Sequence, residues 1–71
     1  MNILITGAFG FVGTNLSKAF KASTNHHLIA VDIAEPKNHA YDEYFSWNEL
    51  EKVDWKTVDA IIHSYNFILS Y

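Results

Sequence analysis

Residues 1–13 give the clearest indication of both fold and function, and they read Met1-Asn2-Ile3-Leu4-Ile5-Thr6-Gly7-Ala8-Phe9-Gly10-Phe11-Val12-Gly13. A short apolar run ends at Thr6, and glycines follow at every third position. This pattern is typical of a strand, a tight glycine turn and the start of a helix. In such a turn, Gly7 permits the reversal, Gly10 lets a pyrophosphate approach the backbone, and Gly13 lets the helix pack against the strand.

The residues after the glycines predict an amphipathic helix whose first turn faces a phosphate. The backbone N–H groups of Phe11 and Val12 lie at the helix N-terminus, where the helix dipole favours negative charge. No acidic residue lies between Gly7 and Ala30 to compete with an anion. The apolar stripe expected to face the sheet consists of Val12, Leu16, Ala19 and Phe20. The competing interpretation is a glycine turn that serves packing alone.

A second buried strand is expected over His27–Asp32, and it closes with an acid. Asp32 follows Gly7 by 25 positions, close to the spacing of the acid that binds the adenosine ribose in dinucleotide folds. Its carboxylate would accept hydrogen bonds from the ribose hydroxyls and repel a 2′-phosphate. The chain has no arginine to offset that repulsion, so NAD is preferred over NADP. The alternative for Asp32 is a solvated acid that ends a strand.

The rest of the chain extends this βαβ unit into a partial Rossmann-like α/β domain. We expect a loop over 33–41, a short strand over 44–47 and a last strand over 58–63. Ser46 and Glu49 have the spacing of a capping box for a brief helix over 49–53. The predicted fold is a doubly wound parallel sheet of about four strands in the order 3-2-1-4.

Composition excludes several other classes of protein. A chain of 71 residues supports one small domain, and a net charge of −3 means that it has no excess of positive charge with which to bind nucleic acid. Cysteine is absent, no signal peptide or membrane-length apolar run is present, and a cytoplasmic location follows by default. The four histidines have no spacing that would converge on a metal. A Walker-type loop is excluded because Thr14 and Asn15, rather than lysine and a hydroxyl residue, follow Gly13.

These motifs resemble the start of the NAD-dependent epimerase/dehydratase family, the extended short-chain dehydrogenases/reductases that typically modify nucleotide sugars. The resemblance rests on residues 3–13 with their T-G-x-x-G-F-V-G form, on Val31-Asp32 and on Val58-Asp59-Ala60-Ile61-Ile62-His63. It implies an NAD cofactor and a nucleotide-sugar substrate in the parent family. The cofactor-binding roles that it assigns fall on Gly7, Gly10, Phe11, Val12, Gly13 and Asp32.

The chain departs from the family after His63, where the small residues expected beside the nicotinamide ribose are replaced by Ser64-Tyr65-Asn66. No tyrosine is followed by a lysine four positions later, so no catalytic residue can be assigned, and the family's adenine-side acid is matched at best by Asn48 or Glu49. We therefore expect a truncated cofactor-binding fragment over 1–63 with an atypical, aggregation-prone tail over 64–71. This chain alone is expected to be inactive. The alternative is a small interaction protein that pairs through an exposed sheet edge.

Overall fold

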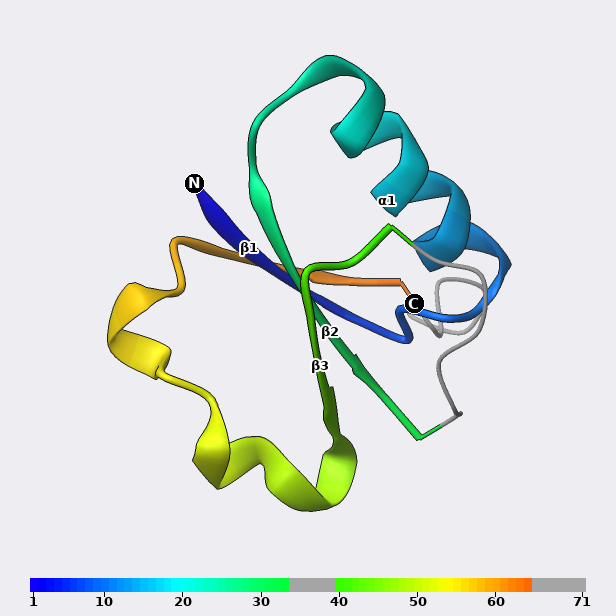
Figure 1. Cartoon of the computed structure of the whole chain (residues 1–71). Helices are drawn as coiled ribbons and strands as arrows, with labels where there is room; N and C mark the ends of the chain where they lie inside the picture. Colours follow the sequence, from blue (N-terminus) through cyan, green and yellow to red (C-terminus); the bar gives the residue numbers. More distant parts are fainter. Residues whose placement is uncertain (34–39, 65–71) are drawn as a thin grey trace.

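The fold is built around a four-stranded parallel sheet with the strand order β3-β2-β1-β4 (Figure 1). The computed structural model describes residues 1–33 and 40–64. The strands are β1 (Asn2–Thr6), β2 (His27–Asp32), β3 (Glu43–Ser46) and β4 (Ala60–His63). Every pairing is parallel, so the carboxyl ends of all four strands meet at one edge. The predicted Rossmann-like α/β fold and its strand order are confirmed.

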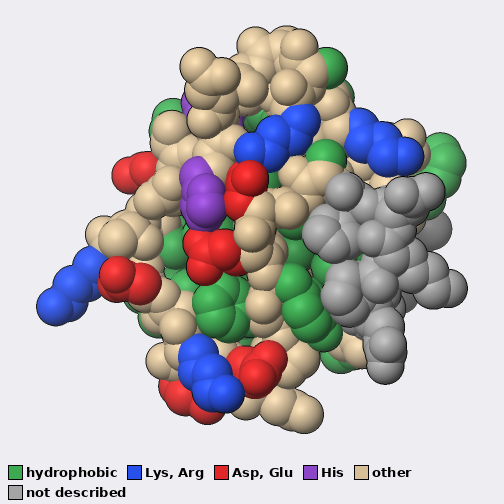
Figure 2. Space-filling view, in the orientation of Figure 1, with side chains coloured by type: hydrophobic (Ala, Val, Ile, Leu, Met, Phe, Trp, Pro, Cys, Tyr) green, Lys and Arg blue, Asp and Glu red, His purple; other side chains and the backbone are tan. Residues whose placement is uncertain are grey.

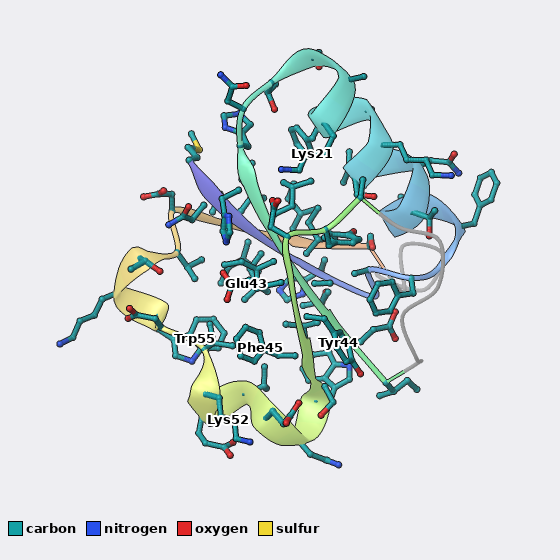
Figure 3. All side chains as sticks on the ribbon, viewed as in Figure 1. Lys21, Glu43, Tyr44, Phe45, Lys52 and Trp55 are labelled. Atoms are coloured by element: carbon teal, nitrogen blue, oxygen red, sulfur yellow. The ribbon has the colours of Figure 1, made fainter. Side chains whose placement is uncertain are left out.

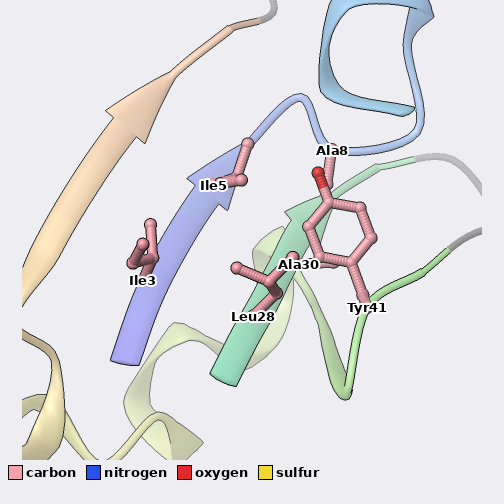
Figure 4. Packing of buried hydrophobic residues seen from close by; sticks show 6 residues of the cluster. All are labelled: Ile3, Ile5, Ala8, Leu28, Ala30 and Tyr41. Carbon is pink, nitrogen blue, oxygen red and sulfur yellow. The ribbon is translucent and has the colours of Figure 1, made fainter. Parts of the chain in front are cut away.

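One face of the sheet is covered by α1 (Phe11–Ser23), whose side of the core is shown in Figure 4. This core cluster contains Ile3, Ile5, Ala8, Leu28, Ala30 and Tyr41, with Leu16 and Phe20 of α1 packed against it. The predicted stripe is wrong at Ala19, which is exposed. The buried positions of α1 are Gly13 and Ser17. Because these residues are small, α1 approaches the sheet most closely along their side, which turns Ala19 towards solvent.

The opposite face is covered by the short 3₁₀ segment η1 (Trp47–Lys52) instead of an α-helix, and a second 3₁₀ segment, η2 (Trp55–Thr57), is exposed. The core cluster on this face consists of Leu4, Ile29, Val31 and Val53, with Phe45, Trp47, Leu50 and Val58 packed around it. Figure 3 shows Phe45 and Tyr44 pointing to opposite sides of β3, as the alternation of a strand requires. Both faces of the central strands are therefore buried, which explains why the runs of β1 and β2 are apolar without alternation.

Element boundaries differ from the prediction by one or two residues. β3 begins and ends one position earlier than expected, and β4 begins at Ala60 rather than at Val58. The predicted capping box forms: the backbone N–H of Ser46 donates to Glu49 Oε1 at 3.2 Å. The helix that it starts is η1, which begins at Trp47 rather than at Glu49. The predicted tail lies outside the described residues except for Ser64.

An ion pair joins the last turn of α1 to the residue that precedes β3. Lys21 Nζ lies 2.6 Å from Asp42 Oδ2, which also accepts a hydrogen bond from the Leu28 N–H at 2.8 Å. Burial alone would raise the pKa of Asp42, but the Leu28 N–H and the Lys21 ammonium together hold that pKa below its usual value. His27 bonds Glu43 next to it, and Figure 2 shows a histidine and acidic side chains gathered on this face. This network lies at the amino ends of the strands, away from the glycine turn.

Candidate functional site

The glycine turn joins β1 to α1 at the carboxyl edge of the sheet. Gly7 has a φ of 63°, in the left-handed region that favours glycine, and its N–H donates to the Val31 carbonyl at 2.9 Å. The Gly10 N–H then donates back to the Gly7 carbonyl at 3.1 Å. The tight reversal predicted at Gly7 is therefore present, and it is anchored to the neighbouring strand β2.

The other two glycines meet very different surroundings. A Cβ on Gly13 would lie 2.6 Å from the Ala8 carbonyl oxygen and 2.7 Å from that of Gly7, closer than any real contact. A Cβ on Gly10 would meet only the Gly7 carbonyl oxygen, at 3.4 Å. Gly13 thus serves the close packing of α1 on the turn. Gly10 leaves backbone accessible, as a cradle for a phosphate requires, and a side chain there would fill that space.

The N-terminus of α1 supplies hydrogen-bond donors and no negative charge. Its N-cap is Gly10, no side chain caps it, and its first turn contains no acidic residue. The first N–H groups of an α-helix have no partner within the helix, and here they include those of Phe11 and Val12. The Phe11 side chain at this end of the helix is 84% exposed.

Asp32 lies at the end of β2, directly against the turn. Its carboxylate accepts hydrogen bonds from the Phe9 N–H to Oδ2 at 2.8 Å and from the Ile33 N–H to Oδ1 at 2.6 Å. The residue is 7% exposed. Asp32 is thus a buried clamp on the glycine turn rather than a solvated strand end.

On the other side of β1, the end of β4 is tied to the same turn. His63 Nδ1 lies 2.8 Å from the Thr6 hydroxyl, and the Ser64 hydroxyl donates to the Thr6 carbonyl at 2.7 Å. Ser64 is buried and also lies 3.3 Å from the Gly7 carbonyl oxygen. The sequence marked Ser64 only as a departure from the family pattern. Its hydrogen bonds fix the start of the turn from the β4 side.

Tyr41 contacts the glycine turn, and the sequence analysis did not predict this contact. It precedes β3 in a segment predicted as loop, yet its side chain is buried beneath α1 and its hydroxyl donates to the Gly13 carbonyl at 2.8 Å (Figure 4). Burial raises the pKa of its phenol to about 12, because the phenolate would lose its hydration there. No periodic pattern surrounds Tyr41, so only its size and apolar ring hinted at this place in the core.

The raised pKa of Tyr41 makes part of the stability dependent on alkaline pH. A phenol of pKa about 10 in the unfolded chain and about 12 in the folded one stabilises the fold fully below pH 10, and that contribution is lost as the pH rises towards 12. We expect the free energy of unfolding to fall by about 2 kcal/mol across this window through Tyr41 alone.

Urea unfolding at pH 9 and at pH 11.5 measures this loss. The Tyr41→Phe variant is the control, because it retains the lysines that also titrate there. A pH dependence that is equal in the two proteins would contradict the assignment.

The structure thus brings together residues that lie far apart in the sequence. Five of the six predicted cofactor residues belong to the turn and the first turn of α1, and Asp32 joins them from β2. Within residues 1–33 and 40–64, no three histidine or acidic side chains gather so as to hold a metal ion. In the same part of the chain, no helix is long and apolar enough to cross a membrane.

Comparisons with known proteins indicate the family of this chain. A family model described as the NAD dependent epimerase/dehydratase family matches residues 3–68. A curated relative, ADP-L-glycero-D-manno-heptose-6-epimerase of Cupriavidus pinatubonensis, is 34% identical over 62 residues, which cover 87% of this chain and 18% of the relative. The chain therefore spans less than a fifth of that relative's length, and no solved structure matches it significantly. With the family model covering nearly the whole sequence, the chain belongs to the NAD-dependent epimerase/dehydratase family.

Proposed function

We propose that this chain binds the adenosine diphosphate half of NAD at the carboxyl ends of β1 and β2. The pyrophosphate would lie at Gly10 and at the N–H groups of Phe11 and Val12, where uncapped donors and the helix dipole favour an anion. Gly7 and Gly13 shape the turn. Asp32 would accept hydrogen bonds from the adenosine ribose.

The observation that carries the proposal is the position of the Asp32 carboxylate, which is 2.8 Å from the Phe9 N–H. This bond joins the acid at the end of β2 to the middle of the glycine turn, so one rigid unit presents both groups. Burying a carboxylate is costly unless it is hydrogen-bonded, and here the N–H groups of Phe9 and Ile33 supply those bonds. Ribose and pyrophosphate are neighbours in NAD, as Asp32 and the turn are here.

We expect weak binding of NAD and weaker binding of NADP. The 2′-phosphate of NADP would bring negative charge against the Asp32 carboxylate, and the chain has no arginine to compensate. Isothermal titration calorimetry of the full chain with each dinucleotide measures the difference, which should be on the order of tenfold or more. Equal affinity for NAD and NADP would contradict the role of Asp32.

A Gly10→Val variant tests the turn itself. A Cβ at Gly10 meets backbone only at 3.4 Å, and the φ of −74° suits any residue, so the fold should survive. The added side chain occupies the approach of the pyrophosphate, and NAD binding should be lost. Asn25→Val is the matched control, because it adds the same side chain at an exposed position away from the turn. NAD binding by Gly10→Val at the wild-type affinity would refute the placement of the pyrophosphate.

We also propose that this chain alone binds cofactor without turnover, since no Tyr-x-x-x-Lys pair, through which the family moves protons, lies within the 71 residues.

The alternative function, pairing with a partner chain through a sheet edge, has one feature in its favour. β4 is one of the two edge strands of the described sheet, and its Ile61 is 49% exposed. Association of the chain with no nucleotide binding would favour that alternative.

A further inference from the structure

Tyr41 contacts the nucleotide-binding turn at two places. Its hydroxyl donates to the carbonyl of Gly13, in the first turn of α1. Its ring meets the ring of Phe9 edge-on, with centroids 5.8 Å apart and an interplanar angle of 90°. One side chain from outside the motif therefore holds both the middle and the end of the glycine turn.

A second aromatic ring and a carboxylate complete this support. Tyr44, in β3, places its ring 5.3 Å from that of Phe9, and the Phe9 N–H donates to Asp32. The backbone and the side chain of Phe9 are thus held by separate groups. These groups come from β2, from β3 and from the segment that leads into β3, so the turn is fixed by elements far from it in sequence.

The hydroxyl of Tyr41 contributes something that apolar packing does not require. The ring lies among Ile3, Ile5, Leu28 and Ala30, where a phenylalanine ring would fill the same space. Burying a hydroxyl costs free energy unless it is hydrogen-bonded, and its acceptor here is the Gly13 carbonyl. Gly13 follows Phe11 and Val12 directly, so this bond restrains the backbone whose N–H groups would face a pyrophosphate.

We propose that Tyr41 is a positioning residue for the pyrophosphate, acting by holding the first turn of α1 in its binding geometry before the ligand arrives. The inference rests on the proposed nucleotide site. A turn that is already fixed loses little conformational entropy on binding, whereas a looser turn must be ordered by the ligand. Adenosine lacks the pyrophosphate, so its binding through Asp32 does not depend on the Gly13 bond.

The test compares ADP with adenosine in the Tyr41→Phe variant of the full chain. We expect ADP affinity to fall roughly five- to tenfold, the effect of one lost hydrogen bond, while adenosine affinity stays at the wild-type value. NMR titrations followed at the backbone amides of Phe11 and Val12 give the ADP constant, and those followed at the amides of Phe9 and Ile33, which donate to Asp32, give the adenosine constant. Ser23→Ala is the matched control, because it removes a hydroxyl that donates to the Ala19 carbonyl at the far end of the same helix.

A general loss of structure would lower the affinity for both ligands, so an equal loss of affinity for ADP and adenosine overturns the positioning role. An ADP affinity that stays at the wild-type value overturns it as well. Should Tyr41→Phe fail to fold, Tyr41→Leu tests the same hydrogen bond, because it also removes the hydroxyl that donates to the Gly13 carbonyl and keeps an apolar side chain in the core. It should show the same selective loss for ADP, and wild-type ADP affinity would overturn the inference. If the wild-type chain does not bind ADP, the proposed function itself is refuted. If the wild-type chain binds ADP and the Tyr41 variant shows no selective loss, only the positioning role of Tyr41 is refuted.

Discussion

Replacing Gly13 with alanine should unfold most of the protein. The added Cβ would lie 2.6 Å from the Ala8 carbonyl oxygen and 2.8 Å from the Ala8 carbonyl carbon, and both are backbone atoms that no side-chain rotation can move. Helix α1 must then retreat from the turn, which separates Leu16 and Phe20 from their core cluster. Alanine gains about 1 kcal/mol of helix propensity over glycine, but overpacking against backbone costs about 3 kcal/mol or more.

A 71-residue domain has only a few kcal/mol of stability to lose, so the far-ultraviolet circular dichroism of Gly13→Ala should lack a cooperative thermal transition. Gly10→Ala is the matched control. It makes the same chemical change three residues earlier, where the new Cβ meets nothing nearer than 3.4 Å, and it should melt within a few degrees of the wild type. A Gly13→Ala protein that melts like Gly10→Ala would contradict the close contact between α1 and the turn.

Replacing Asp32 with asparagine should lower both the stability and the selectivity for NAD. Each carboxylate oxygen accepts a backbone N–H, from Phe9 and from Ile33, and an asparagine must set its NH₂ group against one of these donors. Leaving a buried donor unsatisfied costs about 2 kcal/mol, which lowers the melting temperature of a domain of this size by about 10 °C. The charge that repels a 2′-phosphate also disappears.

Differential scanning calorimetry gives the first effect, and titration with NAD and NADP gives the second, with the affinity ratio expected to approach one. Asp54→Asn is the control, since it makes the same change on an exposed residue. If Asp32→Asn keeps the wild-type melting temperature, the clamp on Phe9 contributes nothing. If it keeps the preference for NAD, Asp32 does not read the ribose.

The sequence predicted the strands because both faces of β1 and β2 are buried, which leaves uninterrupted apolar runs that end in a glycine or an acid. The place of Asp32 beside the turn followed from parallel strand order, since β1 and β2 end at the same edge. Local patterns could not reveal Tyr41 or Ser64, whose hydroxyls bond carbonyls 28 and 58 residues away along the chain. The apolar pattern wrongly predicts that Ala19 faces the sheet, because that pattern reflects hydrophobicity and not side-chain size. The small residues Gly13 and Ser17 instead form the side of α1 that is buried against the sheet.

The central place of β1 also sets the order in which the sheet is completed. One edge of β1 pairs with β2, which arrives after one helix, but its other edge pairs with β4, where Thr6 meets His63. During synthesis, β1 therefore emerges with one edge that stays unpaired with β4 until His63, 57 residues after Thr6, has been made. Closing so long a loop is slow because its entropy is lost before the contacts form. The pairing of β1 with β4 cannot form on the ribosome until the segment Ala60–His63 has left the exit tunnel, so this step follows synthesis of the fourth strand.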